Sequence, residues 1–228
     1  MRHRSATIIV ASLAVVLLLG GAIFLLVGRN DDERGDSGTA VGGIDLSNAT
    51  KEDQAVWAFY NMKRTEPPGK RVVLLGNSMV GIPADALSKR LEDGMKLPVT
   101  VDYGAAMTST DAIGALLKLF TKPPRYLVVD IGRYDSERGI DRGTTLSNIS
   151  MVTTKAAELG VKTIVIGGIG SDGDINFSAA VRSGIGSSAL FVDASPLLLD
   201  PDTRTSPLEL NIQGAAALAT MVQKALAS

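Results

Sequence analysis

The sequence predicts an α/β protein, a three-layer α/β/α sandwich around a five-stranded parallel sheet, preceded by one N-terminal transmembrane helix. From residue 71 onward, short apolar runs typical of strands buried on both faces alternate with segments of helical length. Strands that alternate with helices form a parallel sheet, because each crossover returns the chain to the same edge. The transmembrane helix is predicted by a long uncharged stretch near the N-terminus.

Residues 6–28 are the predicted transmembrane signal-anchor helix. They contain no charged side chain, and at about 1.5 Å per residue a helix of this length crosses the roughly 30 Å hydrocarbon layer. A cleaved signal peptide is the alternative, but its apolar run is only about 7 to 15 residues long. Arg2 and Arg4 favour a short cytoplasmic tail over residues 1–5. We therefore expect a single-pass protein of the cell membrane with its C-terminal domain outside the cytoplasm.

Residues 29–46 are charged and then glycine-rich, which predicts a flexible linker to an α/β domain over residues 47–228. Residues 31–228 carry 20 basic and 24 acidic side chains. This mildly acidic balance argues against nucleic-acid binding, which requires clustered Lys and Arg. Small residues at 20–22 of the membrane helix favour a membrane-protein partner, because they allow close helix packing.

The elements of the domain are expected in a regular order. A helix over 48–64, capped by Ser47 or Asn48, comes first. The strands are expected over 72–75, 99–103, 126–131, 163–166 and 190–192, and the later helices over 83–93, 109–121, 144–160, 176–184 and 211–227. Asn211 is placed to cap the last helix. The loops that follow the strands meet at one edge of the sheet, where ligands bind in such folds.

Two residue types that build many sites are scarce in this chain. Cysteine is absent, and the only histidine is His3, within the predicted cytoplasmic tail. The domain therefore has no thiolate nucleophile, no disulfide and no imidazole to act as a base or a metal ligand. The glycine runs match no phosphate-binding pattern. We expect neither a metal nor a cofactor.

The loops after the strands resemble blocks of the SGNH/GDSL hydrolase family over about residues 71–222. Gly76-Asn77-Ser78 is similar to the family's Gly-Asp-Ser block, Gly104 to its second-block glycine, 132–135 to its Gly-x-Asn-Asp block and 206–211 to its final Asp-x-x-His block. The resemblance implies the flavodoxin-like fold of these esterases and acyltransferases, with an acyl or acetylated-glycan ligand. It makes Ser78 the candidate nucleophile and Gly104 a candidate oxyanion-hole donor.

The departures from the family pattern fall on its catalytic residues. Tyr134 stands at the oxyanion-hole asparagine, Glu209 at the catalytic histidine and Ser206 at the triad aspartate. A serine hydroxyl needs a positioned base, and a carboxylate with a pKa of about 4.3 is a weak one. Tyr134 is a candidate oxyanion donor through its hydroxyl. Glu209 and Asp135 are the candidate non-standard bases or polar site residues.

Each of these residues also has a structural interpretation. Ser78 is placed to cap a helix that starts near residue 82 or to tighten the turn after the first strand. Gly104 is a typical turn glycine, and Asp135 and Glu209 are typical of solvated or helix-capping carboxylates.

The function we expect is that of a membrane-anchored, extracytoplasmic SGNH-hydrolase-like protein with a degenerate catalytic centre. Such a pseudoenzyme would bind a ligand or act as an accessory or scaffold subunit at the cell envelope or in a membrane complex. The alternative is an active acyl-esterase or acyltransferase on acylated envelope glycans or lipids, using Ser78 with a non-histidine base. A third hypothesis is an interaction module without a small-molecule site.

Overall fold

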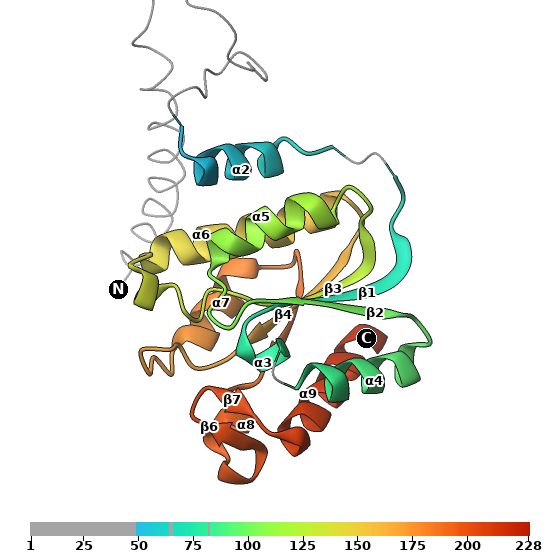
Figure 1. Cartoon of the computed structure of the whole chain (residues 1–228), viewed down its shortest axis with the longest axis vertical. Helices are drawn as coiled ribbons and strands as arrows, with labels where there is room; N and C mark the ends of the chain where they lie inside the picture. The colour runs from blue at the N-terminus through green and yellow to red at the C-terminus, as the bar shows by residue number, and fades with distance from the viewer. Residues whose placement is uncertain (1–48, 64–65, 82) are drawn as a thin grey trace, which may run out of the picture. The chain divides into compact units, whose positions relative to one another are not determined.

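A five-stranded parallel sheet forms the centre of the computed structural model, which describes residues 49–63, 66–81 and 83–228. The strand order is β2-β1-β3-β4-β5, so the first strand, β1, lies inside the sheet and β2 forms one edge (Figure 1). All five expected strands are confirmed. Their bounds are β1 Gly69–Gly76, β2 Val99–Tyr103, β3 Pro124–Asp130, β4 Lys162–Gly167 and β5 Leu190–Asp193.

Helices cover both faces of the sheet and make the three predicted layers (Figure 1). The first face is covered by α5 (Ser109–Leu119), α6 (Arg142–Glu158) and α7 (Phe177–Ile185), with α2 (Lys51–Tyr60) packed on α5. The other face is covered by α3 (Ser78–Gly81), α4 (Ala84–Met95) and α9 (Ile212–Ala227).

The alternation of side chains along each strand assigns residues to the two cores. Val73 and Leu75 of β1 belong to the cluster under α5 and α6, whereas Val72 and Leu74 belong to the cluster under α4 and α9. All four are fully buried. Successive residues of a strand point to opposite faces, so a strand covered on both sides reads as a continuous apolar run.

Side chains at the helix starts account for several helix boundaries. Thr108 and Asp111 form a reciprocal capping box at the start of α5. Asn211 accepts a hydrogen bond from the Gly214 N–H at the start of α9, which confirms its predicted capping role. The first helix is shorter than expected, because α2 begins at Lys51; its predicted caps at 47 and 48 lie outside the described residues.

Several short elements were not anticipated by the sequence pattern. They are the single turn α3, the helix α8 (Ser195–Leu199), the 3₁₀ turns over 136–138 and 201–203, and the hairpin of β6 (Arg204–Ser206) and β7 (Glu209–Leu210). Such elements are too short to show a hydrophobic period. They matter here because α3 directly follows β1, and β7 of the hairpin contacts α3.

The tail over 1–5, the membrane helix over 6–28 and the linker over 29–46 all lie outside the described residues. No helix in the part that the structure does describe has both the length and the apolar character to cross a bilayer.

Candidate functional site

Ser78 lies at the carboxyl end of β1, where it begins the short helix α3. Gly76 precedes it at a close approach between neighbouring strands. Its φ is +156°, and a Cβ at this position would overlap the carbonyl oxygen of Asp130. Only glycine fits there, so the glycine of the Gly-Asn-Ser turn is required by the backbone. This turn places Ser78 at the edge where ligands bind in open sheets.

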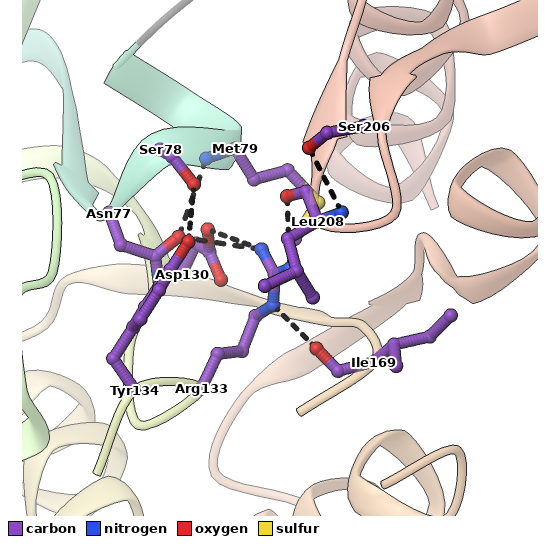
Figure 2. A network of polar contacts seen from close by, with 9 residues as sticks. All are labelled: Asn77, Ser78, Met79, Asp130, Arg133, Tyr134, Ile169, Ser206 and Leu208. Carbon is purple, nitrogen blue, oxygen red and sulfur yellow. Dashed lines mark hydrogen bonds and ion pairs between the residues drawn. The ribbon is translucent and has the colours of Figure 1, made fainter. Parts of the chain in front are cut away.

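The hydroxyl of Ser78 is hydrogen-bonded to the hydroxyl of Tyr134. The distance from Ser78 Oγ to Tyr134 Oη is 3.0 Å, and either group can donate (Figure 2). Ser78 is 3% exposed, and Tyr134 is half-buried. The structure thus places the candidate nucleophile beside the residue at the predicted oxyanion-hole position. Ser78 does not cap the helix that was expected to start near residue 82, because α4 begins without a side-chain cap.

Arg133 lies beneath this hydroxyl pair and ties four segments together (Figure 2). Its Nε donates to the carbonyl of Ile169 at 2.9 Å, and its Nη2 donates to the carbonyl of Leu208 at 3.0 Å. Its Nη1 lies 3.4 Å from Asn77 Oδ1 and 3.5 Å from Asp130 Oδ2. The guanidinium thus holds the loop after β4 and the β6–β7 hairpin against the turn that carries Ser78.

Asp130 is the buried counter-ion of Arg133. It is 0% exposed, and neither carboxylate oxygen has a hydrogen-bond partner in the described part of the chain. Burial raises the pKa of Asp130 to about 6, although the nearby positive charge of Arg133 opposes the rise. This carboxyl therefore titrates close to neutral pH while it is completely enclosed.

Asp135 faces away from this cluster and towards α5 and α6. Its carboxylate accepts hydrogen bonds from the Ser109 N–H at 2.8 Å, the Ser109 hydroxyl at 2.5 Å and the Thr145 hydroxyl at 2.8 Å. The side chain is buried. These contacts tie the loop after β3 to the starts of two helices, which is a structural task, and no hydrogen bond joins Asp135 to Ser78 among the described residues.

The other two predicted site residues, Gly104 and Glu209, make contacts with residues other than Ser78. The N–H of Gly104 donates to the carbonyl of Gly76 at 3.0 Å, so this amide is already committed to the backbone. Glu209 pairs with Ser206 in the β6–β7 hairpin and is half-buried. Within the described ranges it forms no hydrogen bond or ion pair with Ser78.

The sequence pattern did not identify the buried charges Asp130 and Arg133 as part of the site. Both had a usable signal, because Asp130 is a charge at the end of an apolar strand and Arg133 follows two residues after that strand's apolar run. A charge in such a place is buried and needs a partner. The site that results has two neutral hydroxyls, of which that of Ser78 is almost fully buried, and a buried ion pair beneath them. It can donate and accept hydrogen bonds, but no ionised base contacts Ser78 among the residues described.

Comparison with known proteins identifies the fold. No family model matches the chain, and no curated protein matches it in sequence. Among solved structures, an esterase from Pseudoalteromonas sp. is 14% identical, with a TM-score of 0.53, 70% of this chain covered and 97% of that one. A family 3 carbohydrate esterase from Clostridium thermocellum is 16% identical, with a TM-score of 0.55 and 69% and 98% covered.

A third similar structure is a member of the lipolytic G-D-S-L family from Veillonella parvula. It is 14% identical, with a TM-score of 0.54, 69% of this chain covered and 98% of that one. At these identities the likeness shows the fold alone. The three-layer sandwich is that of the SGNH/GDSL hydrolases, which confirms the predicted resemblance at the level of structure.

Proposed function

We propose that this chain is a membrane-anchored, extracytoplasmic protein of SGNH-hydrolase fold that has lost efficient ester hydrolysis and binds a ligand or partner at the cell envelope. The observation that carries the proposal is the partner of Ser78. Its hydroxyl contacts the phenol of Tyr134, where hydrolysis by a serine requires a base. Since the only histidine is His3, no imidazole is available to the described domain.

The surroundings of Ser78 support binding over turnover. Glu209 and Asp135 are the two carboxylates considered as bases, and neither forms a hydrogen bond with Ser78 among the described residues. Glu209 pairs with Ser206 in the β6–β7 hairpin, and Asp135 accepts hydrogen bonds from Ser109. The Gly104 amide, the expected oxyanion donor, is bonded to Gly76. Loss of one oxyanion donor alone lowers the rate of acyl transfer by about 100- to 1,000-fold. A site altered in both respects lacks the means to cleave an ester efficiently.

The proposal is tested by labelling the purified full-length chain with a serine-reactive fluorophosphonate. We expect no labelling at Ser78 and no hydrolysis of an acetyl ester above the background of a Ser78→Ala variant. An active SGNH esterase in the same experiment is the positive control. Labelling that disappears in Ser78→Ala would contradict the proposal, because only an activated hydroxyl reacts.

A second candidate, a slow acyl-esterase or acyltransferase, is favoured by the same hydrogen bond. A phenol 3.0 Å from Ser78 Oγ can accept the serine proton if it is ionised. In that case Tyr134→Phe abolishes labelling and ester hydrolysis, because the oxygen that would take the serine proton is removed. A Tyr134→Phe variant that labels as well as the parent would exclude this role for the phenol.

Membrane attachment and a membrane-protein partner belong to the same proposal and rest on residues 6–28. We expect the chain to stay in the membrane pellet after alkaline carbonate washing, and its C-terminal domain to be digested by protease added outside intact cells. Release by carbonate, or protection from the protease, would contradict the proposed topology.

Detergent extraction is expected to recover a stoichiometric partner, and recovery of a lone monomer would count against the scaffold role.

A further inference from the structure

The edge strand of the sheet ends in an exposed tyrosine next to the Ser78 site. Tyr103 is the last residue of β2 and is 49% exposed. It pairs in register with Gly76, two residues before Ser78, and β2 lies beside β1 at the edge of the sheet. Its ring therefore lies at the same carboxyl edge as the Ser78–Tyr134 pair.

The ring of Tyr103 packs against the backbone of Gly81. A Cβ at Gly81 would overlap three ring atoms of Tyr103, so the ring lies directly against the glycine. Gly81 is the last residue of α3, and Ser78 is the first. One helical turn therefore carries the Ser78 hydroxyl and supports an aromatic ring that is half open to solvent. A ring fixed in this way loses little conformational freedom when a ligand stacks on it.

The polar groups beside this ring carry no net charge. Ser78 and Tyr134 offer hydroxyls that both donate and accept hydrogen bonds. The nearby guanidinium of Arg133 is buried and already committed to Ile169, Leu208 and Asp130. An anionic ligand, such as a fatty-acid carboxylate or a phosphate, finds no free cation among these residues.

We infer that Tyr103 is a stacking platform for the ring of a neutral saccharide, and that the Ser78–Tyr134 pair hydrogen-bonds a polar substituent of the same ligand. A pyranose has an apolar C–H face and a rim of hydroxyls. An aromatic ring packs against the first, and neutral hydroxyls pair with the second. The inference rests on the proposed function, for which it names the ligand class.

The test is a titration of the purified full-length chain with the neutral trisaccharides chitotriose, cellotriose and mannotriose. Binding is followed by calorimetry and by saturation-transfer NMR, in a buffer without alkyl-glycoside detergent, which would itself compete. The variants are Tyr103→Ala, which removes the ring, and Tyr103→Phe, which keeps it. The matched control is Tyr60→Ala on α2, because Tyr60 is also an exposed tyrosine, at 62%, but belongs to the layer on the other side of the sheet.

We expect the chain to bind at least one trisaccharide. The affinity should fall about tenfold in Tyr103→Ala and stay within about twofold of the parent in Tyr103→Phe and Tyr60→Ala. Ser78→Ala should weaken binding of the same sugar. Unchanged affinity in Tyr103→Ala overturns the inference, and so does an equal loss in Tyr60→Ala. Absence of binding to all three sugars overturns it as well. Circular dichroism of each variant separates a lost contact from a lost fold.

Failure of this inference is distinguishable from failure of the proposed function. If the chain binds the short acyl ester triacetin and none of the sugars, the saccharide platform is wrong while a ligand-binding domain remains. If Ser78 is labelled by fluorophosphonate, the proposed loss of catalysis is wrong. In that case the saccharide inference is judged by the Tyr103→Ala titration alone.

Discussion

Two aspartates near the end of β3 are equally buried and have opposite surroundings. Asp135 accepts three hydrogen bonds from Ser109 and Thr145, at 2.5 to 2.8 Å. Asp130 accepts none and has a single ion pair, at 3.5 Å from Arg133. Burial is costly for a charge and raises the pKa of Asp130, because the positive charge of Arg133 and the nearby polar groups of Asn77 and Met79 offset only part of that cost.

The contrast separates a fully hydrogen-bonded part of the site from an incompletely paired one. Asp135 belongs to a satisfied network that fixes the loop after β3 to α5 and α6. Asp130 and Arg133 form the floor under Ser78, where polar groups remain incompletely paired. Perturbed titratable groups of this kind occur at functional sites and in structural ion pairs alike. If the two aspartates differ in energy as they do in geometry, substituting each of them should change the stability of the fold differently.

The largest effect is expected from Asp135→Ala. This change leaves the Ser109 amide and two hydroxyls without their acceptor in a buried place, and should lower the free energy of unfolding by about 3 to 5 kcal/mol. Urea denaturation followed by circular dichroism measures it. Asp141→Ala, which removes an exposed helix cap, is the control and should cost less. If both variants lost an equally small amount of unfolding free energy, the buried hydrogen bonds of Asp135 would not distinguish it energetically from an exposed helix cap.

The free energy of unfolding is expected to depend on pH because Asp130 has different pKa values in the folded and unfolded states. Its pKa is about 6 in the folded chain and 3.8 as the ordinary value. Between these values the folded state binds the proton and the unfolded state does not, so stability falls as pH rises from about 4 to 6 and is constant on either side. The fall should be on the order of 2 to 3 kcal/mol.

The measurement is urea denaturation at several pH values on the parent chain and on Asp130→Asn. The difference between the two curves isolates this one group from other carboxyls, such as Asp193, whose pKa is lowered by hydrogen bonds from Ser178 and Ser195 despite its partial burial. A difference curve that stays flat between pH 4 and 6, or that rises with pH only near and below pH 4, would show that Arg133 holds Asp130 ionised, and the contrast with Asp135 would then disappear.

The smallest effect is expected at the surface of the site. Tyr134→Phe and Ser78→Ala each remove one partner of a single, partly buried hydrogen bond and should cost about 1 kcal/mol or less. The double variant should cost less than the sum of the two, because both changes remove the same bond. Denaturation of the three variants completes this cycle. Strictly additive losses would mean that the two hydroxyls do not stabilise one another.

Much of the fold followed from the sequence, because a strand covered on both faces must be apolar along its whole length. That requirement located all five strands of the sheet. The short elements around the site did not follow, since a single turn such as α3 has no period to detect. Of the site, the sequence placed Ser78 and Tyr134 at one edge, and their hydroxyls lie 3.0 Å apart.

The sequence by itself determined what this domain lacks and how its layers alternate. The single histidine at position 3 denies the domain an imidazole, and the apolar runs prescribe a buried parallel sheet. Only the tertiary structure decided where the polar groups are committed. Arg133 reaches carbonyls 36 and 75 residues further along the chain, and Gly104 donates to Gly76 on the neighbouring strand. Such pairings depend on which loops meet at the sheet edge, and no local pattern encodes that meeting.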